Sequence, residues 1–150
     1  MGGLRALLSI MPNFKKHVTV GAGVGCGLNL AYQLFKLYTS DNPPKDFWEA
    51  LSQVNFLEVG VFAAIGAGCA ALPDLLEPAT TPNHREAFHS LACGGLVGYG
   101  AFGKHTEDLT PDERHGLQVA ALSYLSHLFL DSQTPRSLPL VGIRLPATEI

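Results

Sequence analysis

The sequence predicts an all-α protein, a four-helix up-and-down bundle embedded in a membrane, with a metal site at one end. Three observations support this prediction: four long segments almost without formal charge, helix-start signals between them, and histidines and carboxylates that return to one end. Of the 150 residues, 47% are hydrophobic and only 15% are charged, which is more apolar than an average soluble domain. The length fits one helical domain over residues 11–150, preceded by an N-terminal extension, residues 1–10.

Each apolar segment is too long for an ordinary strand and lacks the breaks of a β-meander. The four segments are residues 17–35, 59–73, 87–103 and 115–130. Proline- and asparagine-rich stretches (SDNPPK, EPATTPN and TEDLTPDE) form the connections. Helix-start signals precede the helices: Asn13, Asp46 with Glu49 before a short helix, Asn83 with Glu86, and Thr110-Pro111 with Glu113.

The length and glycine content of these segments favour a lipid environment. A membrane-spanning helix needs about 20 apolar residues; 17–35 and 87–103 reach this length, and the other two reach it if Glu58 and His115 lie at an interface. Glycine inside a helix costs about 1 kcal/mol relative to alanine in water, whereas in membranes small residues line close helix contacts. The alternative is a soluble bundle with a small-residue core, which should carry a charged stripe on every helix.

Charge and cysteine content narrow the classes of partner. The net charge is −3 and there is no basic run, which argues against nucleic acid and leaves the lipid bilayer as the expected partner. The three cysteines form no CxxC motif and do not describe a disulfide framework. Four antiparallel helices place both termini and the 74–86 connection on one side, and a modest excess of basic residues there favours the cytoplasm. These residues are Arg5, Lys15, Lys16, Arg85, Arg136 and Arg144.

Histidines and carboxylates from all four segments return to that same end. The members are His17 at the start of the first helix, Asp74 and Glu77 at the end of the second, His84 and His89 in the first turns of the third, and His127 and Asp131 at the end of the fourth. His127 and Asp131 are four residues apart and project from one helix face. Each residue alone could be a core or turn residue, but together they would be costly to leave uncompensated in an apolar bundle.

This mixture of ligands predicts a divalent metal site. Histidine with carboxylate suits Zn²⁺, with Mn²⁺ or Fe²⁺ as alternatives, and either one or two ions fit the number of side chains. Such an ion lowers the pKa of a water molecule towards about 7 and supplies hydroxide for hydrolysis. His84 and His89 lie about 140° apart around an ideal helix, so they are not expected to bind one ion in the same way.

The motifs MPNFKKH, LPDLLEP, HREAFHS and YLSHLFLDSQTPRSLPL occur in this order. Together they resemble the YdjM-like family of predicted membrane-bound metal-dependent hydrolases, over roughly residues 11–142. The resemblance implies a bacterial inner-membrane protein with the metal ligands His17, Asp74, His84, His89, His127 and Asp131. Two positions depart from the family pattern: Leu76 stands where a second acid is common, and Ser123 precedes Tyr124 where the family has glycine.

Two functions remain open from the sequence. The first is a membrane-bound hydrolase of phosphoesters or phospholipids that uses metal-activated water. In it His84 or Glu77 is an acid/base or ligand-orienting group, and Arg85 binds the anionic part of the substrate. The second is a non-catalytic membrane protein whose metal cluster is structural or supports a protein interaction; a homo-oligomer fits either. A transporter would instead place polar groups through the depth of the bilayer.

Overall fold

The structure, a computed structural model, describes residues 14–77, 87–133 and 138–139. Within these ranges the chain is helical and has no strand, which confirms the all-α prediction. The elements are α2 (Phe14–Tyr38), α3 (Phe47–Ser52), α4 (Phe56–Leu76), α5 (Leu91–Phe102), the 3₁₀ turn η1 (Lys104–Thr106) and α6 (Pro111–Ser132). Residues 1–10, Asn13 and Asn83 with Glu86 lie outside the described residues.

Local hydrogen bonds explain where two helices begin. Thr110 and Glu113 form the expected reciprocal capping box, with Pro111 in the first turn of α6. The Asp46 side chain accepts from the Glu49 N–H at 2.8 Å and starts the short α3. Both starts were predicted, because each depends on residues only three positions apart.

The third long helix differs from the prediction. Instead of running over 87–103 it begins at Leu91, where the Ser90 hydroxyl accepts from the Cys93 N–H and the Leu91 N–H donates to the Pro139 carbonyl. His89 therefore precedes α5 rather than lying in its first turns, and the expected helical angle between His84 and His89 does not apply. The 12 residues of α5 span about 18 Å, well short of the roughly 30 Å of a bilayer core.

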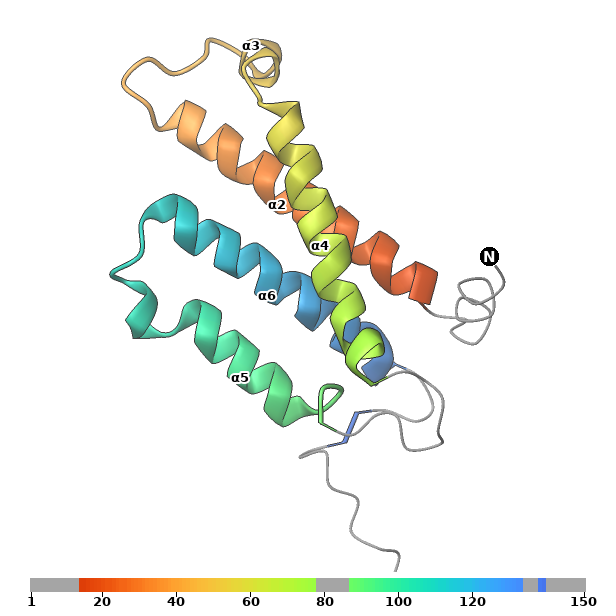
Figure 1. The fold of residues 1–150 in the computed structure, drawn as a ribbon. Helices are drawn as coiled ribbons and strands as arrows, with labels where there is room; N and C mark the ends of the chain where they lie inside the picture. The colour runs from red at the N-terminus through yellow and green to blue at the C-terminus, as the bar shows by residue number, and fades with distance from the viewer. Residues whose placement is uncertain (1–13, 78–86, 134–137, 140–150) are drawn as a thin grey trace, which may run out of the picture.

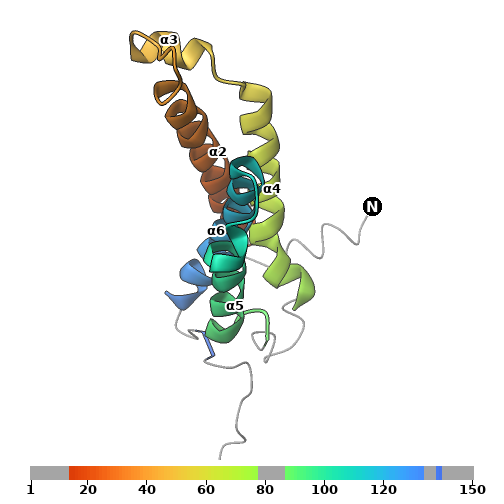
Figure 2. The ribbon, with the colours of Figure 1, turned by 90° about the vertical axis from the view of Figure 1, so that its left-hand side faces the viewer.

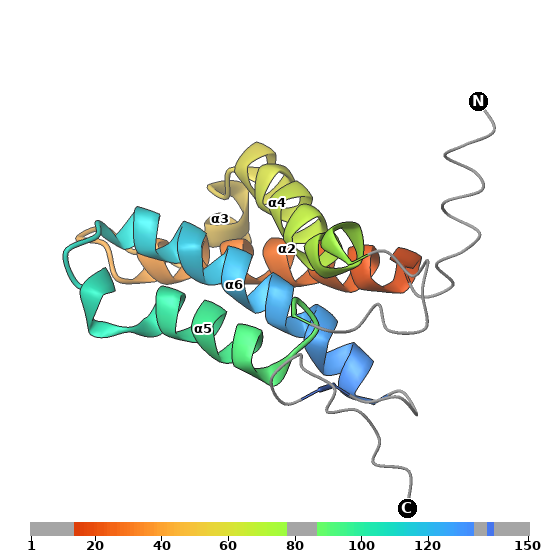
Figure 3. The ribbon, with the colours of Figure 1, turned by 60° about the horizontal axis from the view of Figure 1, so that its bottom comes forward.

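Three long helices form the centre of the molecule. α2 packs extensively against α4, and α6 packs against both, whereas α5 packs mainly against α6. Figures 1 and 3 show α5 lying beside α6, and Figure 2 shows α3 joining α2 to α4 at the far end of that pair. The arrangement is thus a three-helix centre with α5 on its outside.

Glycines allow α2 and α4 to cross at very short range. A Cβ added to Gly21 would lie 2.3 Å from Ala70 Cβ and 2.4 Å from the Gly66 carbonyl oxygen. A Cβ added to Gly25 would lie 2.1 Å from the Phe62 carbonyl oxygen. No larger residue fits this crossing without moving a backbone, which explains the small-residue spacing on both helices.

Two of the described helices, α2 and α4, are long and apolar enough to cross a membrane by length and composition. Only 17% of the most apolar window of α2 and 28% of that of α4 is buried inside the protein. A core helix of a soluble protein would be mostly buried. Several large apolar side chains are accordingly exposed, among them Leu57, Leu96 and Phe129.

Candidate metal centre

The start of α2, the end of α4, the residue before α5 and the end of α6 meet at one end of the molecule (Figures 1 and 3). The side chains that meet there are those of His17, Asp74, His89, His127 and Asp131. All are buried except Asp74, which is partly exposed. The expected convergence of distant histidines and carboxylates is therefore present for these five residues, which we call the histidine–carboxylate cluster.

Hydrogen bonds fix the orientation of two imidazoles. His127 Nδ1 lies 2.7 Å from the Ala70 carbonyl oxygen, which can only accept, so Nδ1 carries the proton. His89 Nδ1 lies 3.0 Å from Glu77 Oε2, and the carboxylate again accepts. In the neutral rings Nε2 therefore carries the lone pair, and in both residues Nε2 faces Asp74 and Asp131. A carboxylate or carbonyl behind the imidazole is the usual support of a metal-ligating histidine.

The spacing of the facing atoms suits a metal ion better than direct hydrogen bonds. His89 Nε2 lies 3.4 Å from Asp74 Oδ1 and 3.7 Å from Asp131 Oδ2. His127 Nε2 lies 3.8 Å and 3.4 Å from the same two oxygens. N–H···O hydrogen bonds are about 2.7–3.2 Å long. By contrast, tetrahedral ligands about 2.0–2.2 Å from zinc lie about 3.3–3.6 Å from one another. The four nitrogen–oxygen distances are thus close to the spacing of ligands around one ion.

His17 adds a third histidine beside this set. Its Nε2 lies 3.4 Å from Asp131 Oδ1, the oxygen that the other two histidines do not face. Its ring stacks on that of His127, with centroids 3.9 Å apart. His17, Asp74 and His127 form one possible ligand group and His89, His127 and Asp131 a second, with the ligand atoms of each group within 4.8 Å of one another. The cluster could therefore hold a metal ion.

Glu77 binds the Nδ1 side of the His89 ring, opposite the Nε2 atom that faces Asp74 and Asp131. Its carboxylate accepts from His89 Nδ1 and from the N–H groups of Ala87 and Phe88, at 2.7 and 3.1 Å. Burial raises the pKa of Glu77, but these hydrogen bonds outweigh it and hold the pKa below its ordinary value. Burial lowers the pKa of His89, but the carboxylates of Asp74 and Glu77 outweigh it and raise the pKa. The metal-free cluster thus favours a second proton on His89, at Nε2, and a metal ion would displace that proton.

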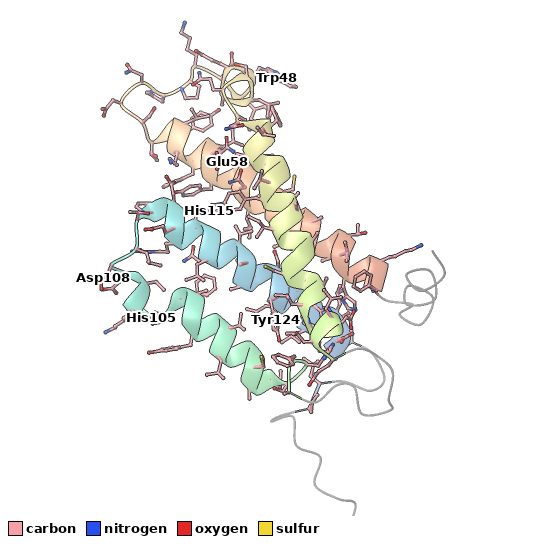
Figure 4. All side chains as sticks on the ribbon, viewed as in Figure 1. Trp48, Glu58, His105, Asp108, His115 and Tyr124 are labelled. Carbon is pink, nitrogen blue, oxygen red and sulfur yellow. The ribbon has the colours of Figure 1, made fainter. Side chains whose placement is uncertain are left out.

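Tyr124 ties α6 to the segment that carries His89. Its hydroxyl donates a short hydrogen bond to the Phe88 carbonyl oxygen and lies 3.2 Å from Cys93 Sγ. This role was not predicted from the sequence, because the hydrogen bond joins residues 36 positions apart. Figure 4 shows Tyr124 near the cluster end of α6, with His105, Asp108 and His115 at the opposite end.

His84 and Arg85 lie outside the described residues, so their expected roles as ligand, acid/base group and anion contact remain predictions. His105 is exposed, and its Nε2 lies 3.0 Å from the Gly100 carbonyl oxygen. His115 is half-buried, because its ring stacks on Tyr32 with centroids 4.0 Å apart.

A second polar network, which the sequence analysis missed, lies towards the opposite end of α2. Asn29 is fully buried and donates to Glu58 Oε1 at 3.1 Å. Gln33 donates to Asn29 at 2.7 Å, and its oxygen accepts from the Asn55 N–H at 2.7 Å. The four-residue spacing of Asn29 and Gln33 was the available signal. Glu58 of α4 is thus tied to Asn29 of α2.

No family model, curated protein or solved structure matches this sequence. The resemblance to the YdjM-like family therefore remains a prediction.

Proposed function

We propose that the histidine–carboxylate cluster binds one or two divalent ions, most simply Zn²⁺, and that the chain is a membrane-bound metal-dependent hydrolase of phosphoesters or phospholipids. The observation that carries the proposal is the spacing of the two Nε2 atoms and two carboxylate oxygens, at 3.4–3.8 Å. The hydrogen bonds of His127 Nδ1 to the Ala70 carbonyl and of His89 Nδ1 to the Glu77 carboxylate also support the proposal.

A divalent ion in such a site polarises a phosphoryl oxygen and lowers the pKa of water. The residues of this chain would hold the ion and orient the substrate. His89 and His127 present Nε2 lone pairs, and Asp74 and Asp131 supply negative oxygens. Asp74 is the partly exposed member, so a substrate would approach on its side. Arg85 is proposed to bind the substrate anion and His84 to ligate the metal or to serve as an acid/base group.

The membrane part of the proposal rests on α2 and α4, which are apolar, of sufficient length and little buried. We place the cluster end and both termini on the cytoplasmic side of a bacterial inner membrane. Lys15 and Lys16 are exposed at the start of α2, beside the cluster, as basic residues on the cytoplasmic side should be.

One observation favours the non-catalytic alternative. Two imidazole nitrogens and two carboxylate oxygens face one another here. A closed four-ligand site is typical of structural zinc, whereas catalytic zinc keeps a position for water. In that case the ion would join the end of α4, the segment before α5 and the end of α6, and perform no hydrolysis.

Metal content of the purified full chain tests the proposal. Wild type, His127→Ala and Asp131→Asn would be dialysed against trace zinc and measured by elemental analysis, with the exposed His105→Ala as the matched control. Wild type and the control should retain one or two equivalents, and both cluster variants should lose metal. Full retention in both cluster variants would refute the site. Bound metal without hydrolysis of a phosphoester and phospholipid panel would favour the structural alternative.

A further inference from the structure

An apolar groove lies between α4, α5 and α6. Its cavity volume is about 430 Å³, within the range of about 300–1,000 Å³ that small-molecule sites occupy. Leu72 and Leu76 of α4 form one wall, Val97 and Gly100 of α5 the facing wall, and Leu117 of α6 part of the floor. The groove exists because α5 packs against α6 and leaves a gap towards α4.

One end of the groove adjoins the histidine–carboxylate cluster. Phe88 and Tyr124 line the groove there, and Phe88 directly precedes His89. Gly100 lies at the other end, because α5 runs away from the cluster. Gly100 follows Cys93 by seven positions, which gives the groove a length of about 10 Å along the helix.

The lining offers almost nothing for a polar ligand. The Tyr124 hydroxyl is already used by the Phe88 carbonyl and Cys93. Three lining leucines leave the groove open to the outside: Leu72, Leu76 and Leu117 are 41, 52 and 39% exposed. The occupant is therefore apolar and enters from the apolar surroundings of α4, one of the two helices suited to a membrane.

The apolar lining and the opening beside α4 favour an alkyl chain of surrounding lipid over a segment of a protein partner. A single alkyl chain is thin enough to enter. Its head would then lie at the end that adjoins His89.

We propose that this groove binds one alkyl chain of a lipid and thereby places the lipid's polar head at the histidine–carboxylate cluster. The proposal rests on the proposed function and names its substrate class as phosphoesters that carry a long alkyl chain. Phe88 and Tyr124 then mark the boundary between the chain and the head.

Glycines of α5 provide a groove-filling variant and its matched control. A Cβ on either Gly100 or Gly95 meets nothing within 4 Å, so a leucine at either position fits the backbone. Gly100 lines the far end of the groove, and Gly95 does not line it. Gly100→Leu should shorten the groove and Gly95→Leu should not. Ala120→Leu, on the floor, fills it independently.

The experiment uses the full chain in phosphatidylcholine nanodiscs, labelled by an alkyl phosphate that carries a photoreactive group at the chain end. Unlabelled alkyl phosphates of increasing length compete for the site. In wild type and Gly95→Leu, competition should improve about fourfold per methylene until the groove is full and then level off. In Gly100→Leu and Ala120→Leu it should level off at a shorter chain. Label should map to the α5 wall and the α6 floor in wild type.

Identical chain-length curves in all four proteins, or label spread evenly over exposed residues such as Leu57, would overturn the groove assignment. Metal content and hydrolysis of p-nitrophenyl phosphate, which has no alkyl chain, are measured on the same samples. Absence of metal and of hydrolysis, together with the expected chain-length shift, would refute the proposed function but not the groove assignment. Presence of metal and of hydrolysis without any chain-length shift would refute the groove assignment alone.

Discussion

The close crossing of α2 and α4 predicts opposite effects for two alanine substitutions only two residues apart. In Gly21→Ala the new Cβ would lie 2.3 Å from Ala70 Cβ, whereas carbon atoms in contact lie about 3.5–4.0 Å apart. The helices must therefore separate by about 1 Å or more. In Gly23→Ala the new Cβ meets nothing within 4 Å. The first substitution should destabilise the protein and the second should stabilise it.

The magnitudes follow from two opposing effects. Overpacking costs about 1–3 kcal/mol, and alanine gains about 1 kcal/mol over glycine inside a helix. Because one clash at Gly21 is with the Gly66 backbone, which cannot rotate away, we expect a net loss of about 1–2 kcal/mol for Gly21→Ala. Gly23→Ala should gain about 0.5–1 kcal/mol. At about 2–4 °C per kcal/mol, Tm should fall by about 2–8 °C in the first variant and rise by about 1–4 °C in the second.

Thermal unfolding of the metal-free proteins in one detergent, followed by far-UV circular dichroism, measures both shifts. A second readout is zinc affinity, because His17 lies one turn before Gly21 on α2. Affinity should fall in Gly21→Ala and stay at the wild-type value in Gly23→Ala. Tm shifts of the same sign and size in the two variants would refute the close crossing.

Three further predictions concern the support of His89 and the start of α6. Glu77→Gln keeps the shape but removes the charge behind His89, so zinc should bind about 10–100-fold more weakly by competition with a chelating dye. In EDTA, the Tm difference between wild type and Glu77→Gln should be largest between about pH 4.5 and 6.5. The lowered pKa of Glu77 contributes stability that is lost as pH falls through the pKa of Glu77 in the folded protein. The raised pKa of His89 contributes stability that is lost as pH rises through the pKa of His89 in the folded protein. A Tm difference independent of pH would contradict the pairing of Glu77 with His89. Tyr124→Phe removes the bond to Phe88, so unfolding free energy should fall by about 1 kcal/mol with weaker zinc binding, and unchanged zinc affinity would contradict the tie. Thr110→Ala should cost about 1 kcal/mol and leave metal content unchanged, because the cap is at the other end of α6.

Features set by neighbours in the chain could be predicted from the sequence. The Thr110 capping box and the Asp46 cap require only three-residue spacing, and the structure confirms both. The meeting of His17 with Asp131 followed from helix count and direction alone, since each residue sits at a helix end. Such predictions need the order of elements and no packing detail.

Features set by distant contacts could not be predicted. The start of α5 depends on the Ser90 cap and on a hydrogen bond to the Pro139 carbonyl. The position of α5 on the outside of the three central helices depends on its packing against α6. The same limit applies to Glu58, whose partner Asn29 comes from another helix. Hydrophobic periodicity places a residue in a helix but does not say which helix faces it.

Because α2 and α4 touch so closely at Gly21 and Gly66, a tilt of α2 about this contact would move its two ends by unequal amounts. Four residues, about 6 Å, separate Gly21 from His17, and twelve residues, about 18 Å, separate it from Gln33. A sideways displacement of about 1.5 Å at Gln33 therefore becomes about 0.5 Å at His17, near the tolerance of about 0.5 Å within which a functional site must be held. The close contact near His17 thus limits how much of any displacement at the α3 end reaches the ligand geometry, and the Asn29–Glu58 and Gln33–Asn55 hydrogen bonds restrain that end as well.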